Sequence, residues 1–148
     1  MNKKSLAIAL CTLFTTLPAL AGPDAVALTS CLTDNTSGKD RKNLAKWVFA
    51  AMSTHPEIRE FAVVTDKVRD QTSNTMGVLV TRLLSEDCAK QAQAAIRNEG
   101  QVAMQTAFRA LGGLAMQELM SNPEVTASFS TFEKYLDRRK IEAAVPSR

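Results

Sequence analysis

Apolar residues recur at helical spacing through most of the chain, whereas runs of β-branched residues are short and lack hairpin turns beside them. The clearest case is one face of a predicted helix over residues 39–53, made at i, i+3, i+4 and i+7 by Leu44, Trp47, Val48 and Ala51. A shorter apolar pattern follows Pro23, which suits a first helical position, and predicts a helix that ends near Asp34. The pattern therefore indicates an all-α protein.

Capping signals divide the middle of the chain into further helices. Thr54, Pro56 and Glu57 have the spacing of a capping box with a proline in the first turn, so we predict a third helix that starts there. Its predicted apolar face is made by Ile58, Phe61, Ala62, Thr65 and Val68. The acidic pair in Ser85-Glu86-Asp87 predicts another helix start, and Gly100 suits the end of that alanine-rich helix.

Two features mark the last third of the chain. Gly112-Gly113 interrupts an apolar stretch over residues 102–120, so we expect the helix to bend there or a neighbour to pack very close. Asn122-Pro123-Glu124 predicts the start of a last helix, whose apolar stripe is Val125, Phe129, Phe132 and Leu136. We predict a single compact bundle of five or six helices, with a core formed mostly by Leu44, Trp47, Val48, Phe61, Leu83, Phe108, Leu111, Phe129 and Phe132.

The first 21 residues have the features of an export signal. A short basic start precedes an apolar run over residues 6–17, which is too short to span a bilayer, and residues 19–21 form a small-residue cleavage box. We expect cleavage before Gly22, which would release an all-helical domain of residues 22–148 into the periplasm or the medium. Beyond the signal, no apolar stretch is long enough for a transmembrane segment.

The charge balance argues against nucleic-acid binding. The whole chain has 18 Lys and Arg residues against 15 Asp and Glu residues. Removal of Lys3 and Lys4 with the signal would leave sixteen basic residues and a net charge of about +1. Domains that bind nucleic acids usually show a clear basic excess, often with interleaved aromatic residues. We therefore expect no nucleic-acid partner.

Cysteine number and spacing predict one disulfide. Cleavage would remove Cys11 and leave Cys31 and Cys88, a lone pair in an oxidising compartment. A bond between them would join the first helix to the helix that starts near Ser85. The alternative is a pair of buried free thiols, which mass spectrometry without reduction would reveal.

Chemistry-bearing residues are sparse in the exported part. Its single histidine, His55, lies in the predicted helix start, and paired carboxylates such as Glu57 and Glu60 are explained by capping or by ion pairs. We predict no catalytic residue, no metal site and no cofactor. An enzyme that uses His55 or paired carboxylates is the least favoured alternative.

A candidate binding surface does emerge around the second predicted helix. Lys39, Arg41 and Lys42 cluster near its start, where an anion or an acidic partner would be favoured, and Trp47 and His55 follow further along. A well-capped, solvated turn explains the same basic residues without any partner.

One stretch resembles a known group of proteins. The run from Cys31 to Lys42, followed by Trp47 and by His55-Pro56-Glu57, resembles small uncharacterised exported proteins of Gram-negative bacteria over about residues 28–60. The resemblance implies an all-helical secreted domain. It carries over no activity, cofactor or catalytic residue.

The sequence leaves two binding functions open. The first is a non-enzymatic periplasmic or secreted interaction module, an adaptor, inhibitor or chaperone-like binder whose partner is a protein of the cell envelope. The second is a carrier of an apolar small molecule or lipid, which would use adaptable methionines and the space beside Gly112-Gly113. A lipid that remains bound through purification would favour the carrier.

Overall fold

The computed structural model describes residues 21–145, and most of them are helical. In chain order the elements are α1 (Pro23–Asp34), α2 (Gly38–Met52), α3 (Asp66–Arg82), the π-helical η1 (Leu83–Asp87), α4 (Ala89–Glu99), α5 (Gln101–Met120), α6 (Pro123–Ser130), the 3-10 helix η2 (Thr131–Tyr135) and α7 (Arg138–Ala144). The described residues contain no strand, so the all-α prediction is confirmed, and none of their helices is long and apolar enough to cross a membrane. Residues 1–20 of the predicted leader lie outside the described residues.

Seven α-helices are present between residues 21 and 145, where five or six were expected. The additional helix arises because the last predicted helix is divided. After α6 the chain tightens into the 3-10 geometry of η2, and this helix ends before Leu136, whose backbone is extended. Asp137 starts α7 by accepting the backbone N–H of Lys140 at 3.2 Å, a side-chain cap that favours a new helix.

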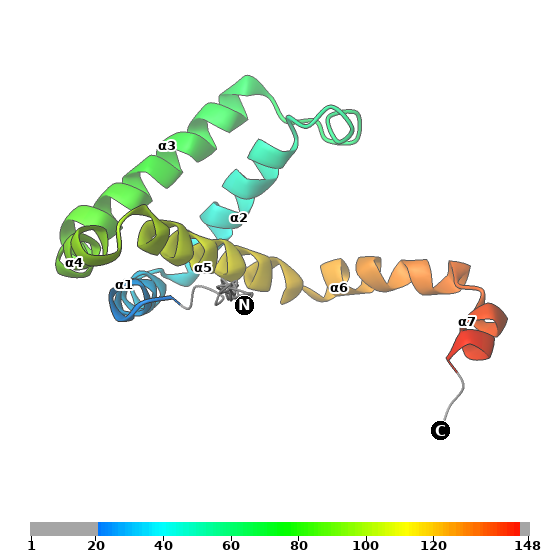
Figure 1. Cartoon of the computed structure of the whole chain (residues 1–148). Helices are drawn as coiled ribbons and strands as arrows, with labels where there is room; N and C mark the ends of the chain where they lie inside the picture. The colour runs from blue at the N-terminus through cyan, green and yellow to red at the C-terminus, as the bar shows by residue number, and fades with distance from the viewer. Residues whose placement is uncertain (1–20, 146–148) are drawn as a thin grey trace, which may run out of the picture.

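Helix α5 is the centre of the body, which we define as α1 to α5. It packs against α1, α2 and α4, and α3 packs against α2. Figure 1 shows α2 and α3 rising together above α5. The buried side of α5 repeats every four residues and is made of Ala103, Ala107, Leu111 and Ala115. Because three of these side chains are single methyl groups, neighbouring helices can approach α5 closely.

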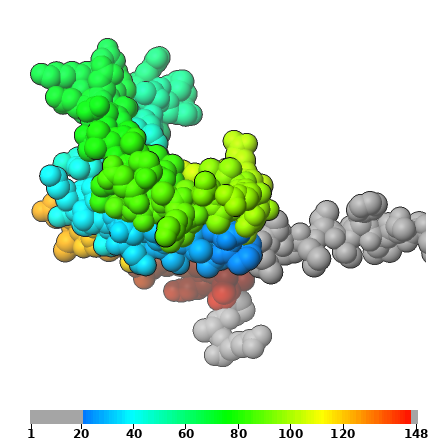
Figure 2. All heavy atoms as spheres, turned by 90° about the vertical axis from the view of Figure 1, so that its left-hand side faces the viewer, coloured from blue at the N-terminus to red at the C-terminus, as the bar shows by residue number. Residues whose placement is uncertain are grey.

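The connection between α2 and α3 corrects the prediction of a helix starting at Thr54. Residues 53–61 form a series of turns, and α3 begins only at Asp66, capped by the Thr65 side chain. The Thr54 hydroxyl donates backward to the carbonyl of Ala51 at 2.8 Å, so it finishes α2 instead of capping a new helix. Figure 2 shows this connection and the tip of α3 projecting away from the other helices.

The predicted core is only partly correct. Leu44, Leu83 and Leu111 are buried, and Trp47, Val48 and Phe108 are half-buried. The remaining three predicted core residues are exposed, with 86% of Phe61, 62% of Phe129 and 59% of Phe132 open to solvent. Phe61 lies in the unpacked connection, and the other two lie beyond α5, where the body offers no surface to cover them. The buried core depends instead on alanine and leucine, including Ala25, Leu28, Leu32, Ala92 and Ala95.

The predicted disulfide is confirmed at one end of the body. Cys31 of α1 is bonded to Cys88 at the start of α4, with 5.8 Å between their Cα atoms. Arg82 lies beside this bond and holds two carboxylates, that of Asp40 from α2 at 3.1 Å and that of Asp87 at 3.0 Å. We call this cluster the braced end, because covalent and ionic links there involve five consecutive helical segments, α1, α2, α3, η1 and α4.

The opposite end of α1 is held by a side chain from α4. The Glu99 carboxylate accepts the backbone N–H groups of Asp24 at 2.8 Å and of Ala25 at 3.1 Å. These are two of the N–H groups that a helix start leaves without an intrahelical partner, and a carboxylate also suits the positive end of the helix dipole. Both ends of α1 are therefore attached to α4.

Candidate binding groove

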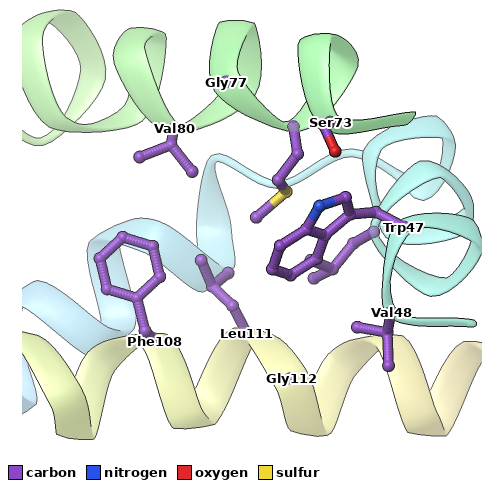
Figure 3. Close-up of a pocket in the computed structure, with 10 residues that line it drawn as sticks. Trp47, Val48, Ser73, Gly77, Val80, Phe108, Leu111 and Gly112 are labelled. Carbon is purple, nitrogen blue, oxygen red and sulfur yellow. The ribbon is translucent and has the colours of Figure 1, made fainter. Parts of the chain in front are cut away.

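An apolar groove opens between α2, α3 and α5. It has a volume of about 640 Å³ and is lined by Leu44, Trp47, Val48, Ser73, Met76, Gly77, Val80, Phe108, Leu111 and Gly112. Figure 3 shows Trp47 from α2, Val80 from α3 and Phe108 and Leu111 from α5 directed into the same space. We call this site the Trp47 groove.

Two glycines explain why the groove is open. Gly77 faces it from α3 and Gly112 faces it from α5, on opposite walls. A Cβ built at either position would meet no heavy atom within 4 Å, so the space beside each backbone is unfilled. Residues with side chains at these positions would narrow the groove from both sides.

The expectation that a neighbour packs close to Gly112-Gly113 is corrected by the same observation. Helix α5 runs without interruption from Gln101 to Met120, and no neighbour packs close to either glycine. A single helix spans the pair because its buried side, centred on Leu111, continues to Ala115 and is held by the surrounding helices. The glycines create room at the surface of the body and do not break the helix.

Aromatic side chains give the groove its chemistry. Trp47 and Phe108 are each half-buried, so their rings rest on the core while part of each remains accessible. Ser73 contributes the one hydroxyl group among the lining residues. Such a surface favours an apolar group with at most one or two polar contacts, because burying it releases water from rings and methyl groups.

The five residues predicted as a binding surface do not come together. Trp47 lines the groove, whereas Lys42 lines a second cavity, which lies on the opposite side of α2. Lys39 is exposed in the first turn of α2, and His55 is exposed beyond its last turn. A helix of 15 residues is about 22 Å long, so these two lie too far apart to share a small ligand. Arg41 is half-buried in the first turns of α2.

The residues that carry the family resemblance have structural roles at the corner between α1 and α2. Ser37 and Asp40 form a reciprocal capping box, at 3.2 Å and 3.1 Å. The buried Thr36 hydroxyl donates to the carbonyl of Leu32 at 2.6 Å, and the Asn35 amide donates to the carbonyl of Cys31 at 2.8 Å. The run therefore stabilises the corner between α1 and α2 beside the disulfide.

Other predicted groups lie away from the groove. His55, Glu57 and Glu60 are all exposed in the connection between α2 and α3, where the His55 Nδ1 accepts the backbone N–H of Glu57 at 3.2 Å. Met116 and Met120 are exposed near the end of α5. Between residues 21 and 145, His, Cys, Asp and Glu side chains form no group of three that could hold a metal ion.

Sequence patterns did not reveal the α3 wall of the groove. Ser73, Gly77 and Val80 were not recognised as part of a site. The signal that could have revealed them is a glycine within an otherwise apolar helical pattern, because such a glycine costs helix stability unless the backbone needs space beside it.

Comparison with known proteins gives no relative from which a function could be inferred. No family model, no curated protein and no solved structure matches this chain. The function is therefore inferred from the geometry of the Trp47 groove and its surroundings.

Proposed function

We propose that this protein is a non-enzymatic interaction module of the cell envelope that holds apolar side chains of a partner protein in the Trp47 groove. The observation that carries the proposal is an open apolar groove with glycines on two walls and half-buried aromatic rings between them. A helical segment of a partner fits this shape, since amphipathic helices dock into grooves with anchors at i, i+3, i+4 and i+7.

The size of the groove agrees with this mode of binding. Its volume of about 640 Å³ exceeds what one aliphatic side chain fills and suits a few side chains on one helix face. Three separate helices form the walls, and the groove is open to solvent, so one face of a helix can reach it. The glycine walls would allow the partner backbone to approach closely.

The disulfide supports the proposed compartment. A structural disulfide persists in the periplasm or outside the cell and is rare in a reducing cytosol. The Cys31–Cys88 bond therefore agrees with export of the chain. A partner should accordingly be sought among proteins of the cell envelope.

A pair of glycine variants tests the proposal. Gly112→Leu places a side chain in the groove, whereas Gly113→Leu changes the neighbouring residue, which does not line it. Neither substitution meets a heavy atom at its Cβ, and leucine favours a helix over glycine, so both variants should fold at least as well as the natural chain. The pair separates loss of binding from loss of stability.

The readout is crosslinking in living cells. A photoreactive amino acid is placed at Ser73, which is exposed on the groove wall, and at Gln93, which is exposed on α4, as a site control. A discrete adduct should form from position 73, persist with Gly113→Leu and disappear with Gly112→Leu. An adduct that survives Gly112→Leu, or that forms equally from position 93, would contradict the proposal.

The volume and lining of the groove also favour a second candidate, a carrier of an apolar small molecule. Ligand sites commonly have volumes of about 300–1,000 Å³ with few polar groups, as here. Because Trp47 is the only tryptophan, its fluorescence would report an apolar ligand directly. Native mass spectra would show a bound small molecule that Gly112→Leu removes and Gly113→Leu retains. A bare protein mass together with a specific protein adduct would favour the interaction module.

A further inference from the structure

A helical arm extends from the body. We define the arm as residues 123–145, comprising α6, η2 and α7, and Figure 1 shows it running away from the other helices beyond the end of α5. Its side chains are exposed throughout, except for Val125, which is half-buried. Within the described residues, α5 is the only body helix that α6 contacts.

The arm nevertheless carries large apolar side chains. Val125, Phe129 and Phe132 stand at i, i+4 and i+7, the narrow spacing of a helix that packs against protein. Tyr135, Leu136 and Ile141 follow and are also exposed. The arm has four basic and four acidic residues. A helix that lies on a membrane has a broad apolar face and usually a basic excess, so this pattern favours a protein surface over a lipid surface.

A second groove begins at the base of the arm. It has a volume of about 640 Å³ and is lined by Lys42, Ala45, Lys46, Phe49, Glu118, Leu119, Ser121, Asn122, Pro123 and Val125. We call it the base groove. It lies on the side of α2 opposite to the Trp47 groove, and Phe49 is 54% exposed within it. Val125 belongs both to this groove and to the stripe, so one apolar surface continues from the groove along the arm.

We propose that two copies of the protein pair reciprocally, each with the arm of one copy in the base groove of the other. A two-fold axis brings the same patch of both copies together, and such an interface requires a surface that complements itself. The arm and the base groove provide the two halves of that surface on one chain. Phe132 lies seven residues beyond Val125, about 10 Å along a helix, so crossing arms can place it at the groove of the second copy.

Charges at the edge of the base groove agree with this pairing. Lys42 and Lys46 line the groove on α2. On the arm, Glu133 directly follows Phe132 in the sequence and is exposed. When Phe132 enters the groove of the second copy, Glu133 can approach the two lysines, and the neighbouring Lys134 can approach Glu118, which lines the groove from α5. The attraction between exposed charges is weak, but it favours this register over one that opposes like charges.

The area available on the arms is sufficient for a stable dimer. Phe129, Phe132 and Tyr135 are 62%, 59% and 80% exposed, which leaves on the order of 400 Å² of aromatic surface open on each arm. Two reciprocal arms, counted with the groove surface that they cover, would bury on the order of 1,200 Å², the lower limit of a standard specific interface. The proposal is independent of the Trp47 groove, since the two grooves lie on different sides of α2.

Mass measurements on the purified protein test the pairing. Sedimentation equilibrium should give twice the chain mass for the natural protein and the single chain mass for a Phe129→Glu/Phe132→Glu variant. Ala127→Glu is the matched control, because position 127 is two residues from Val125 and so lies on the opposite face of α6. This variant adds a charge to the same helix and should remain a dimer. A natural chain that is a monomer throughout the micromolar range would overturn the proposal.

Cysteine crosslinking tests the register without adding a charge to the arm. Phe49→Cys protein and Phe132→Cys protein are mixed under mild oxidation and separated without reduction. A mixed disulfide dimer should form, and Ala127→Cys in place of Phe132→Cys should give none. Equal crosslinking from both arm positions would overturn the register. Binding of the monomeric chain to phosphatidylglycerol vesicles, lost in Phe129→Glu/Phe132→Glu, would assign the arm to a lipid surface and overturn the pairing.

Discussion

The body and the arm have the same kind of sequence pattern but different tertiary surroundings. In α2, Leu44, Trp47 and Val48 form an apolar face that meets α3 and α5. In the arm, Val125, Phe129 and Phe132 form an equally regular stripe, yet both phenylalanines are exposed. Helical spacing therefore identifies an apolar face, whereas burial of that face depends on whether another element of the same chain can reach it.

The largest difference should appear when the disulfide is removed. Replacing both Cys31 and Cys88 by alanine should lower the free energy of unfolding by about 4 kcal/mol, because the bond closes a loop with a sequence separation of 57 in the unfolded chain. Urea denaturation followed by circular dichroism measures the change. The natural chain after reduction should show a loss of similar size, and an unchanged midpoint would mean that the bond does not constrain the unfolded chain.

Truncation of one apolar side chain in each region sharpens the comparison. Leu111→Ala removes a fully buried side chain at the centre of α5 and should cost about 2–5 kcal/mol. Phe132→Ala removes a larger side chain from the arm and should change the free energy of unfolding by less than about 0.5 kcal/mol. Both are measured by urea denaturation at concentrations low enough to keep the chain monomeric. A cost above about 1.5 kcal/mol for Phe132→Ala would place its ring against the body.

The features that could be predicted from the sequence are those set by local patterns, and the features that could not be predicted depend on tertiary surroundings. The fold class, the disulfide and the starts of α1, α2 and α6 could be predicted because each depends on nearby residues or on a single pair of cysteines. The helix predicted from Thr54 was wrong, because the Thr54 hydroxyl bonds back to α2 and the real cap, Thr65, comes after an unpacked connection. Local capping patterns cannot distinguish the end of one helix from the start of the next.

The groove was harder to predict because it is formed by three helices that are distant in sequence. Trp47 and Gly112 were singled out for separate reasons, and nothing in their spacing placed them on the same site. Gly77 completes the groove from α3, and its role depends on how far apart α2 and α3 lie. An open space is a property of tertiary packing, so a sequence pattern can suggest the glycines but cannot identify the cavity between them.

A smaller effect is expected at the start of α1. Glu99→Ala removes the acceptor for two backbone N–H groups and should cost about 1 kcal/mol, as the loss of a helix cap does. Glu99→Gln is the matched control, since its amide oxygen can still accept one of these bonds and should preserve part of the stability. Thermal unfolding of the three proteins measures the difference. Equal losses in both variants would show that charge matters more than the hydrogen bonds.

The smallest measurable effect should come from the ion pairs of the braced end. Arg82 is partly exposed and contacts the carboxylates of Asp40 and Asp87 from two different nitrogens. Arg82→Lys should lower the free energy of unfolding by about 0.5 kcal/mol, because one ammonium group cannot pair with both carboxylates as the planar guanidinium group does. The loss is small because solvent screens the attraction. The cost should shrink when urea denaturation is repeated at high salt. Lys140→Ala, which removes a more exposed pair with Asp137 in the arm, is the control and should leave the midpoint unchanged at either salt concentration. If both substitutions had the same effect, the disulfide alone would hold the braced end together.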